Sequence, residues 1–275
     1  MYNMAMKQVQ FVDTHCHIHF PDYELPEEEV IANAAKAGVT RLMAVGCTLE
    51  DSKLAIKLAA KYDHVWATIG LHPHEGAHYV HDERALQEFH GLSTKPRVVA
   101  VGEIGLDYYY NNAPKEDQIK LLRFQLTIAE EHNLPVVFHV RDDPALTPDD
   151  PRSVWADFWP IYDEFKPKGV VHCFSAGIKE LEQILGRDLF VGLNGIMTFT
   201  KKQEQLEAAK AVPLERILLE TDAPFLTPNP FRGTMCEPKH VAVTAEFLSN
   251  LRGESLEEFA LTTTDNAVRL FNLYV

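Results

Sequence analysis

Short apolar runs rich in β-branched residues recur along the chain, and a longer segment separates each run from the next. We expect strands at residues 9–17, 39–46, 64–72, 97–103, 134–140, 169–174, 189–194 and 216–222. The segments between them, of which 26–38 and 117–132 are the clearest, repeat apolar residues at a spacing near 3.6. Strands that alternate with amphipathic helices are typical of parallel sheets.

Eight predicted strands favour a closed (β/α)8 barrel of the TIM type over an open doubly wound sheet. Two extra C-terminal helices, at about 238–251 and 255–271, would follow the last strand. No Pro/Ser-rich linker divides the chain, so we expect one domain over residues 1–275. Long loops at 141–153 and 223–238 follow the fifth and eighth strands, at the end of the barrel where such folds build active sites.

Composition and charge restrict the function. Hydrophobic residues make up 46% and charged residues 24%, which is the mix of a soluble globular protein. The N-terminal MYNMAMKQVQ lacks the apolar core of a signal peptide, no apolar stretch could span a bilayer, and four cysteines do not indicate a disulfide framework. We therefore expect a cytoplasmic protein with no membrane partner. The formal charge of −14 slows the approach of a polyanion, so a nucleic-acid substrate would need cations at the site itself.

Side chains that can bind metals fall at the ends of the predicted strands. They are His15 and His17 on the first strand, Glu103 on the fourth, His139 on the fifth, His172 on the sixth and Asp222 on the eighth. All of them lie at the carboxyl end of the predicted barrel, where barrel enzymes carry out their chemistry. One or two such positions would mean little in a chain with 13 histidines, but six positions on five strands indicate a site.

Residues two apart on a strand face the same way, and this periodicity sorts the neighbours of the six residues. Asp13 is expected behind the histidines and could converge with them, and His19 shares their face. Glu220 lies one layer deeper and could orient a ligand histidine. Cys16 and Cys173 should face outward, toward the helices.

Four imidazoles and two carboxylates form a mixed nitrogen and oxygen set that suits divalent Zn, Mn, Fe or Ni. Six ligands exceed the needs of one tetrahedral site. We therefore expect two divalent metal ions per chain that share a bridging carboxylate and leave positions for water and substrate. A Mg site would not need four histidines, although Mg could still support activity.

The motifs resemble those of the TatD family of metal-dependent hydrolases, a branch of the amidohydrolase-like barrels. They are FVDTHCH at 11–17, IGLHPH at 69–74, VGEIGLDYY at 101–109, LPVVFH at 134–139, VVHCFSAG at 170–177, LLETDAPFLTP at 218–228 and RG…EP at 232–238. The resemblance implies a TIM-like barrel with a dinuclear centre. It implies that His15, His17 and Asp222 hold one metal, that His139 and His172 hold the other, and that Glu103 bridges them. The pair His17 and His19 is an alternative that the family pattern disfavours.

The same resemblance implies hydrolysis of phosphodiesters, typically in DNA and often from the 3′ end. We therefore expect a deoxyribonuclease with a DNA substrate, single-stranded or with 3′ ends, and no obligate protein partner. Asp222 and Glu103 are the predicted catalytic residues, with Asp222 orienting the attacking water and accepting its proton. The chain departs from the family pattern at residues 139–150 and at Cys236, both in loops expected along the substrate groove.

Candidate substrate-binding residues follow the predicted strands. They are His72 and His74 after the third strand, Arg141 after the fifth and Arg232 after the eighth, with Lys201 and Lys202 as further candidates for phosphate binding. Residues 108–110 are three tyrosines that could stack against a base, but packing is the expected role of aromatic residues in such a loop.

Two other functions stay open at the level of sequence. The barrel could hydrolyse another ester, such as a D-aminoacyl ester on tRNA or a small phosphodiester, because barrels host many chemistries. It could also be a metal-binding accessory protein without turnover, although structural metal sites are usually closed.

Overall fold

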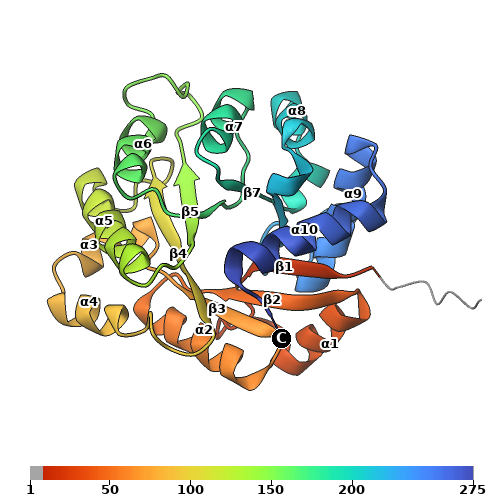
Figure 1. Ribbon diagram of the computed structural model, residues 1–275, viewed down its shortest axis with the longest axis horizontal. Helices are drawn as coiled ribbons and strands as arrows, with labels where there is room; N and C mark the ends of the chain where they lie inside the picture. Colours follow the sequence, from red (N-terminus) through yellow and green to blue (C-terminus); the bar gives the residue numbers. More distant parts are fainter. Residues whose placement is uncertain (1–8, 275) are drawn as a thin grey trace, which may run out of the picture.

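The strands follow one another around a barrel in the order of the chain. The computed structural model describes residues 9–274, and in it each strand is parallel to the next (Figure 1). They are β1 (Phe11–Cys16), β2 (Val39–Val45), β3 (Val65–Ile69), β4 (Val98–Asp107), β5 (Val136–Arg141), β6 (Gly169–Val171), β7 (Phe190–Leu193) and β8 (Ile217–Leu219). This arrangement confirms the predicted (β/α)8 barrel of the TIM type.

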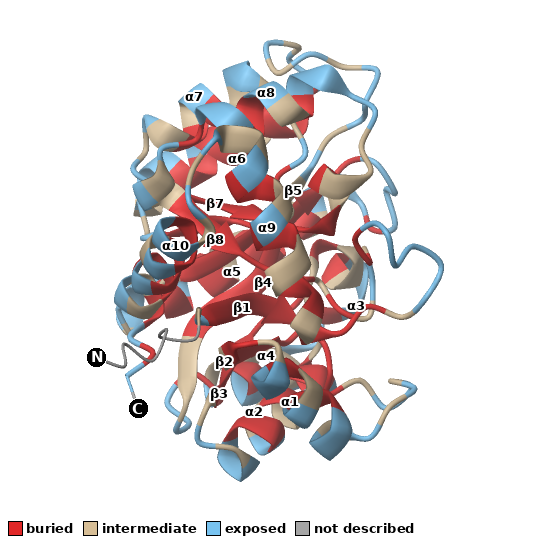
Figure 2. Ribbon diagram, turned by 90° about the vertical axis from the view of Figure 1, so that its right-hand side faces the viewer, coloured by how far each residue is buried: buried red, intermediate tan, exposed pale blue. Residues whose placement is uncertain are grey.

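Helices cover the outside of the barrel (Figures 1 and 2). They are α1 (Glu27–Lys36), α2 (Leu49–Lys61), α3 (Gly76–Tyr79), α4 (Glu83–His90), α5 (Lys115–Glu131), α6 (Val154–Phe165), α7 (Ile178–Leu185), α8 (Gln203–Ala211), α9 (Val241–Arg252) and α10 (Leu256–Phe271). The last two are the predicted C-terminal helices. Every helix of residues 9–274 is too short or too polar to cross a membrane. Residues 1–8, where we predicted no leader, lie outside the described part.

Local sequence explains how these helices form, and α2 is an example. The Thr48 hydroxyl accepts a hydrogen bond from the Asp51 amide at 3.0 Å and so caps the helix. Acidic residues in the first turn and Lys61 in the last complement the helix dipole. Ala55 and Leu58 on the inner face are buried against the barrel.

The amino-terminal end of the barrel is closed by α10. One buried residue from each strand, namely Val12, Met43, Trp66, Ala100, Val137, Val170, Phe190 and Leu218, packs with residues of this C-terminal segment. Phe271 of α10 and the following Leu273 complete this cluster. Figure 2 shows α10 on one side of the barrel and α3, which follows the carboxyl end of β3, on the other. Hydrocarbon therefore fills the amino-terminal end, and the polar side chains of the interior lie at the carboxyl end.

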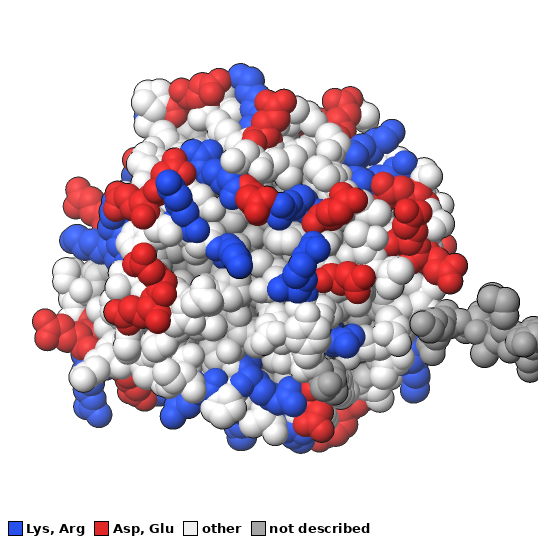
Figure 3. Space-filling model, in the orientation of Figure 1, with Lys and Arg blue, Asp and Glu red and all other residues white. Residues whose placement is uncertain are grey.

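The outer face that carries α10 mixes both signs of charge, since Lys and Arg are interspersed there with Asp and Glu (Figure 3). Some charged side chains form ion pairs between neighbouring helices. Lys61 of α2, for example, lies 3.0 Å from Glu27 and 2.7 Å from Glu28 of α1. Exposed pairs of this kind contribute little to stability.

The junction between β1 and β8 completes the barrel. The Asp222 amide donates to the His15 carbonyl at 2.8 Å. The buried Asp13 carboxylate accepts hydrogen bonds from the Thr221 amide at 2.9 Å and from the Thr221 hydroxyl at 2.6 Å. The prediction that Asp13 converges with the histidines is therefore wrong, because its carboxylate turns toward β8 and joins the first strand to the last.

Replacing Thr221 by valine is expected to destabilise the fold by about 1–3 kcal/mol, because the buried Asp13 carboxylate loses a hydrogen-bond donor. The change should lower the urea midpoint of unfolding. Thr221→Ser keeps the hydroxyl and is the matched control. An unchanged midpoint in Thr221→Val would show that the hydroxyl does not hold this junction.

Candidate metal centre

The structure brings the six predicted ligands together at the carboxyl end of the barrel. They are His15 in β1 and His17 just beyond it, Glu103 in β4, His139 in β5, His172 directly after β6 and Asp222 after β8. Four of them are buried, and His139 and Asp222 are partly exposed. The six predicted ligands therefore lie together at the carboxyl end of the barrel, and their side chains point into its interior.

The first group of donors surrounds His15. Its Nε2 atom lies 3.2 Å from Nε2 of His17, 3.6 Å from Oδ1 of Asp222 and 3.4 Å from Oε2 of Glu103. Nε2 of His17 is 3.4 Å from the same Asp222 oxygen. The other ring nitrogen of His17, Nδ1, is 2.8 Å from the Val45 carbonyl, which orients the ring and leaves Nε2 for this group.

The second group surrounds the other oxygen of Glu103. Oε1 lies 2.6 Å from Nδ1 of His139, 3.4 Å from Nε2 of His172 and 3.7 Å from Nε2 of His72. The two oxygens of this carboxylate therefore face different groups of imidazoles.

The spacing of these donors fits a divalent cation. Two ligand atoms about 2.1 Å from a zinc ion, at the tetrahedral angle, are roughly 3.4 Å apart. The donor separations around His15 span 3.2–3.6 Å. His15, Glu103 and His172 form another group whose possible ligand atoms lie within 4.8 Å of one another. The residues present thus match the chemistry that a metal requires.

Electrostatics favour a cation at the same place. Burial raises the pKa of Glu103, but the neighbouring imidazoles of His172 and His139 outweigh this effect and hold the pKa well below its usual range. Burial also raises the pKa of Asp222, and the contact with His17 outweighs it. Both carboxylates are therefore ionised at neutral pH, so a cation at this rim meets two negative charges.

Glu220 lies behind His172, at the position predicted for an orienting carboxylate. Its Oε1 atom is 3.0 Å from Nδ1 of His172 and accepts hydrogen bonds from the Cys173 amide at 2.7 Å and from Nδ2 of Asn194 at 3.0 Å. The Glu220 carboxylate is thus held beside Nδ1 of His172, whose Nε2 atom lies 3.4 Å from Oε1 of Glu103.

His19 forms a further group of possible metal ligands with His17 and Asp51. Its Nε2 atom is 2.7 Å from Oδ1 of Asp51, a residue of α2. His15 rather than His19 contacts both Glu103 and Asp222. The pairing of His15 and His17 stays a prediction; it is the pair in which both histidines lie next to Asp222.

Asp107 is a residue of the site that the sequence reasoning missed. Its Oδ2 atom lies 2.9 Å from Nε2 of His139 and 3.1 Å from Nε2 of His74. Its Oδ1 atom accepts the amide hydrogens of Tyr109 at 3.0 Å and Tyr110 at 2.9 Å. One carboxylate therefore orients two histidines and the start of the following loop. Cys47, which is 3.7 Å from Oε2 of Glu103, was missed as well.

We expect Asp107→Asn to weaken divalent-ion binding by about 10- to 100-fold, because His139 loses the carboxylate that fixes its ring. Competition with a chromophoric chelator measures this affinity. Asp163→Asn, in an exposed pair with Arg187, is the control. Equal affinity in Asp107→Asn and the native protein would contradict an orienting role.

The predicted substrate-binding residues differ in position. His72 joins the second group, and His74 contacts Asp107. Arg141 is exposed and lies next to the site, with its guanidinium over the rings of the tyrosines that follow β4. Arg232 is exposed too, but it donates to the Thr227 carbonyl at 3.0 Å and so helps to shape its own loop. Lys201 and Lys202 are exposed.

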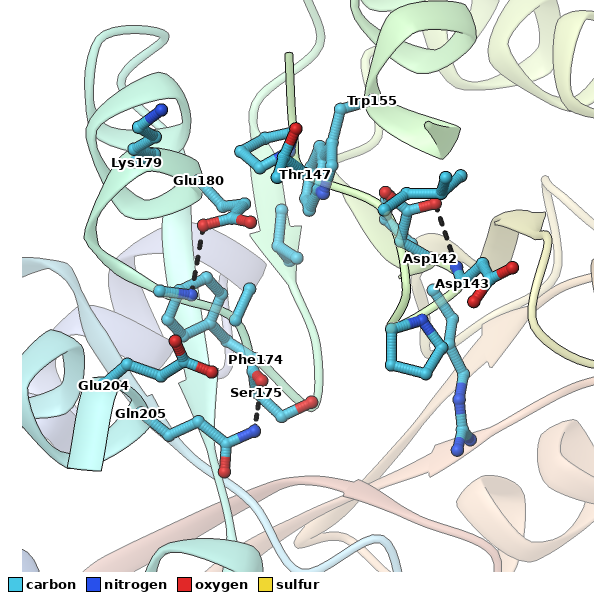
Figure 4. A pocket seen from close by; sticks show the side chains of 18 of the residues that line it. Asp142, Asp143, Thr147, Trp155, Phe174, Ser175, Lys179, Glu180, Glu204 and Gln205 are labelled. Atoms are coloured by element: carbon cyan, nitrogen blue, oxygen red, sulfur yellow. Dashed lines mark hydrogen bonds between the residues drawn. The ribbon is translucent and has the colours of Figure 1, made fainter. Parts of the chain in front are cut away.

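A cavity of about 730 Å³ lies beside the centre, between the loop that follows β5 and the segment that follows β6 (Figure 4). Figure 4 shows Asp142 and Thr147 on one side and Ser175 and Gln205 on the other. Asp142 caps α6 through the Val154 amide at 2.9 Å. The loop whose sequence departs from the family pattern therefore forms one wall of this cavity.

Comparison with known proteins gives consistent matches. Residues 12–272 match the family model described as TatD related DNase. The chain is 34% identical to the uncharacterized metal-dependent hydrolase YabD of Bacillus subtilis, over 95% of this chain and 98% of that protein. It is 32% identical to the 3′-5′ ssDNA/RNA exonuclease TatD of Pectobacterium carotovorum, over 91% of this chain and 95% of that protein. The crystal structure of the TatD homologue YjjV of Escherichia coli superposes with a TM-score of 0.84 at 32% identity, and the match covers 96% of this chain and 98% of that one.

Proposed function

Because the chain belongs to the TatD-related DNase family of metal-dependent hydrolases, we propose that it hydrolyses phosphodiester bonds of DNA, progressively from the 3′ end. The observation that carries this proposal is the position of Glu103, with one carboxylate oxygen toward each group of imidazoles. The name of the related exonuclease supports the choice of DNA as substrate.

In this proposal the centre binds two divalent ions. His15, His17 and Asp222 would hold one of them. His139 and His172, which both lie next to Oε1 of Glu103, would hold the other, and Glu103 would serve both. The nitrogen-rich set suits Zn, Mn, Fe or Ni, and Mg could sustain activity.

The residues of the chain then have distinct tasks. When bound, the ions act as Lewis acids that lower the pKa of water from about 15.7 toward 7 and stabilise negative charge on the phosphoryl group. Asp222 orients the attacking water and accepts its proton at Oδ1, because its lowered pKa keeps it ionised at neutral pH. Arg141, exposed at the rim, binds a phosphate oxygen of the strand. This cation supplies positive charge at the site, in a chain whose formal charge is −14.

The test combines elemental analysis of the purified protein with digestion of end-labelled single-stranded DNA. A 5′ label should give a descending ladder of products, and a 3′ label should give mononucleotide from the start. Chelation should stop digestion, and added Mn or Zn should restore it. Metal-loaded protein that leaves the oligonucleotide intact would overturn the proposal. Parallel assays of a chromogenic phosphodiester and a D-aminoacyl-tRNA would then show whether another ester is the substrate, and inactivity on all of them would favour an accessory protein.

A further inference from the structure

Aromatic side chains stand exposed on two sides of the metal centre. Tyr109 and Tyr110 after β4 are 47% and 53% exposed, and Phe225 after β8 is 53% exposed. Tyr108, in contrast, is 9% exposed and donates its hydroxyl to Asp157 at 2.7 Å. The prediction that these tyrosines pack is therefore right for Tyr108 and wrong for its two successors. Single exposed aromatic residues are ordinary, but these three border one site.

The two tyrosines are tied to the centre through their neighbours. The ring of Tyr110 lies 5.6 Å from the ring of His74, whose Nε2 contacts Asp107. The Arg141 guanidinium lies over both tyrosine rings, 4.4 Å from the centroid of Tyr109 and 4.7 Å from that of Tyr110. A cation and two exposed rings therefore share one edge of the rim.

Phe225 borders the opposite group of donors. Its amide donates to the Asp222 carbonyl at 2.8 Å, which fixes its position three residues after the proposed general base. Its ring lies 6.5 Å from the ring of His17. A flat group stacked on Phe225 would thus be next to the first group of donors.

We propose that Tyr109, Tyr110 and Phe225 bind unpaired bases on either side of the cleaved phosphate, and that Arg141 binds the phosphate next to the tyrosines. This inference rests on the proposed function. In a chain of charge −14, long-range attraction does not supply the affinity for a polyanion, so contacts at the site supply it, and stacking on the exposed rings is one such contact. In a duplex each base already stacks on its neighbours, whereas a single strand can splay its bases onto aromatic rings. These side chains would then determine the preference for single strands.

Binding without turnover tests the assignment. In the presence of chelator, fluorescence anisotropy of a labelled oligo-dT measures affinity, and quenching of a 3′-terminal 2-aminopurine reports stacking. We expect Tyr109→Ala/Tyr110→Ala and Phe225→Ala each to weaken binding by about 5- to 150-fold per lost stack, and the quenching to diminish. The double change to Phe keeps both rings and should restore most of the affinity. Tyr274→Ala, which removes an aromatic residue that is 69% exposed beyond α10, is the matched control.

An oligonucleotide with abasic sites at its 3′ end separates stacking from phosphate contacts. The native protein should bind it as weakly as the Ala variants bind the normal strand, and the Ala variants should no longer distinguish the two strands. Unchanged affinity in the Ala variants, or equal affinity of the native protein for both strands, would overturn the assignment. If the native protein binds and quenches as expected but does not cleave when loaded with metal, the proposed function fails and the stacking surface stands.

Discussion

Replacing Glu103 by alanine is expected to abolish hydrolysis, with a fall in kcat/KM of at least about 10³-fold. The reason is that one carboxylate serves both groups of donors, since Oε2 lies 3.4 Å from His15 and Oε1 lies 2.6 Å from His139. Without it, each group keeps its imidazoles but loses the anion between them. We therefore expect metal content to fall together with activity.

Elemental analysis and single-strand digestion measure these two losses, and circular dichroism checks that the variant is folded. Glu131→Ala, which removes an exposed carboxylate paired with His90 on the outside of the barrel, is the matched control. Retention of native turnover by Glu103→Ala would rule out a shared carboxylate at the reaction centre.

Replacing Asp222 by asparagine is expected to lower kcat by about 10²- to 10⁴-fold, because the amide keeps the shape of the side chain but cannot accept a proton. The loss of metal content should be smaller than in Glu103→Ala. The group around Oε1 of Glu103 stays intact, so the loss is limited to one ion. The affinity for single-stranded DNA measured under chelation should change little.

The comparison of the two variants therefore distinguishes a chemical role from a structural one. Single-turnover digestion gives the rate of the chemical step, and elemental analysis of the same sample gives the metal content. Asp63→Asn, in an exposed pair with Arg97, is the control for this substitution. An Asp222→Asn variant that digests DNA at the native rate would exclude Asp222 as the proton acceptor.

The eight strands and the donors at their ends could be predicted because both follow from simple periodicities. In a parallel barrel every carboxyl end meets the same rim, so the rings of His139 in β5 and His172 just after β6 lie 6.3 Å apart. Asp107 was within reach of the same reasoning, since it shares with Glu103 the alternate positions of β4. The error concerning Asp13 has another cause. Periodicity predicts which face of a strand a side chain lies on. It does not predict that the Asp13 carboxylate accepts a hydrogen bond from the Thr221 hydroxyl at the junction of β1 and β8.

Loop side chains were harder to place. Cys47 and the exposed rings of Tyr109 and Tyr110 lie beyond the strands, where no repeat relates sequence position to direction. Their position beside the centre depends on contacts between loops of different strands, such as that of Arg141 with both rings.

Three of the six donors, His15, His17 and Asp222, lie at the ends of the first and last strands of the barrel, and the hydrogen bonds of Asp13 to Thr221 are part of the junction between these strands. His15 and Asp222 are thus assembled by partners separated by nearly the whole chain. A chain that stops before β8 lacks Asp222, so in the proposed function this half of the centre would form only after β8 has paired with β1. In the folded protein, separation of β1 from β8 would release an ion bound to this half of the centre. Loss of that ion would therefore precede unfolding of the rest of the barrel.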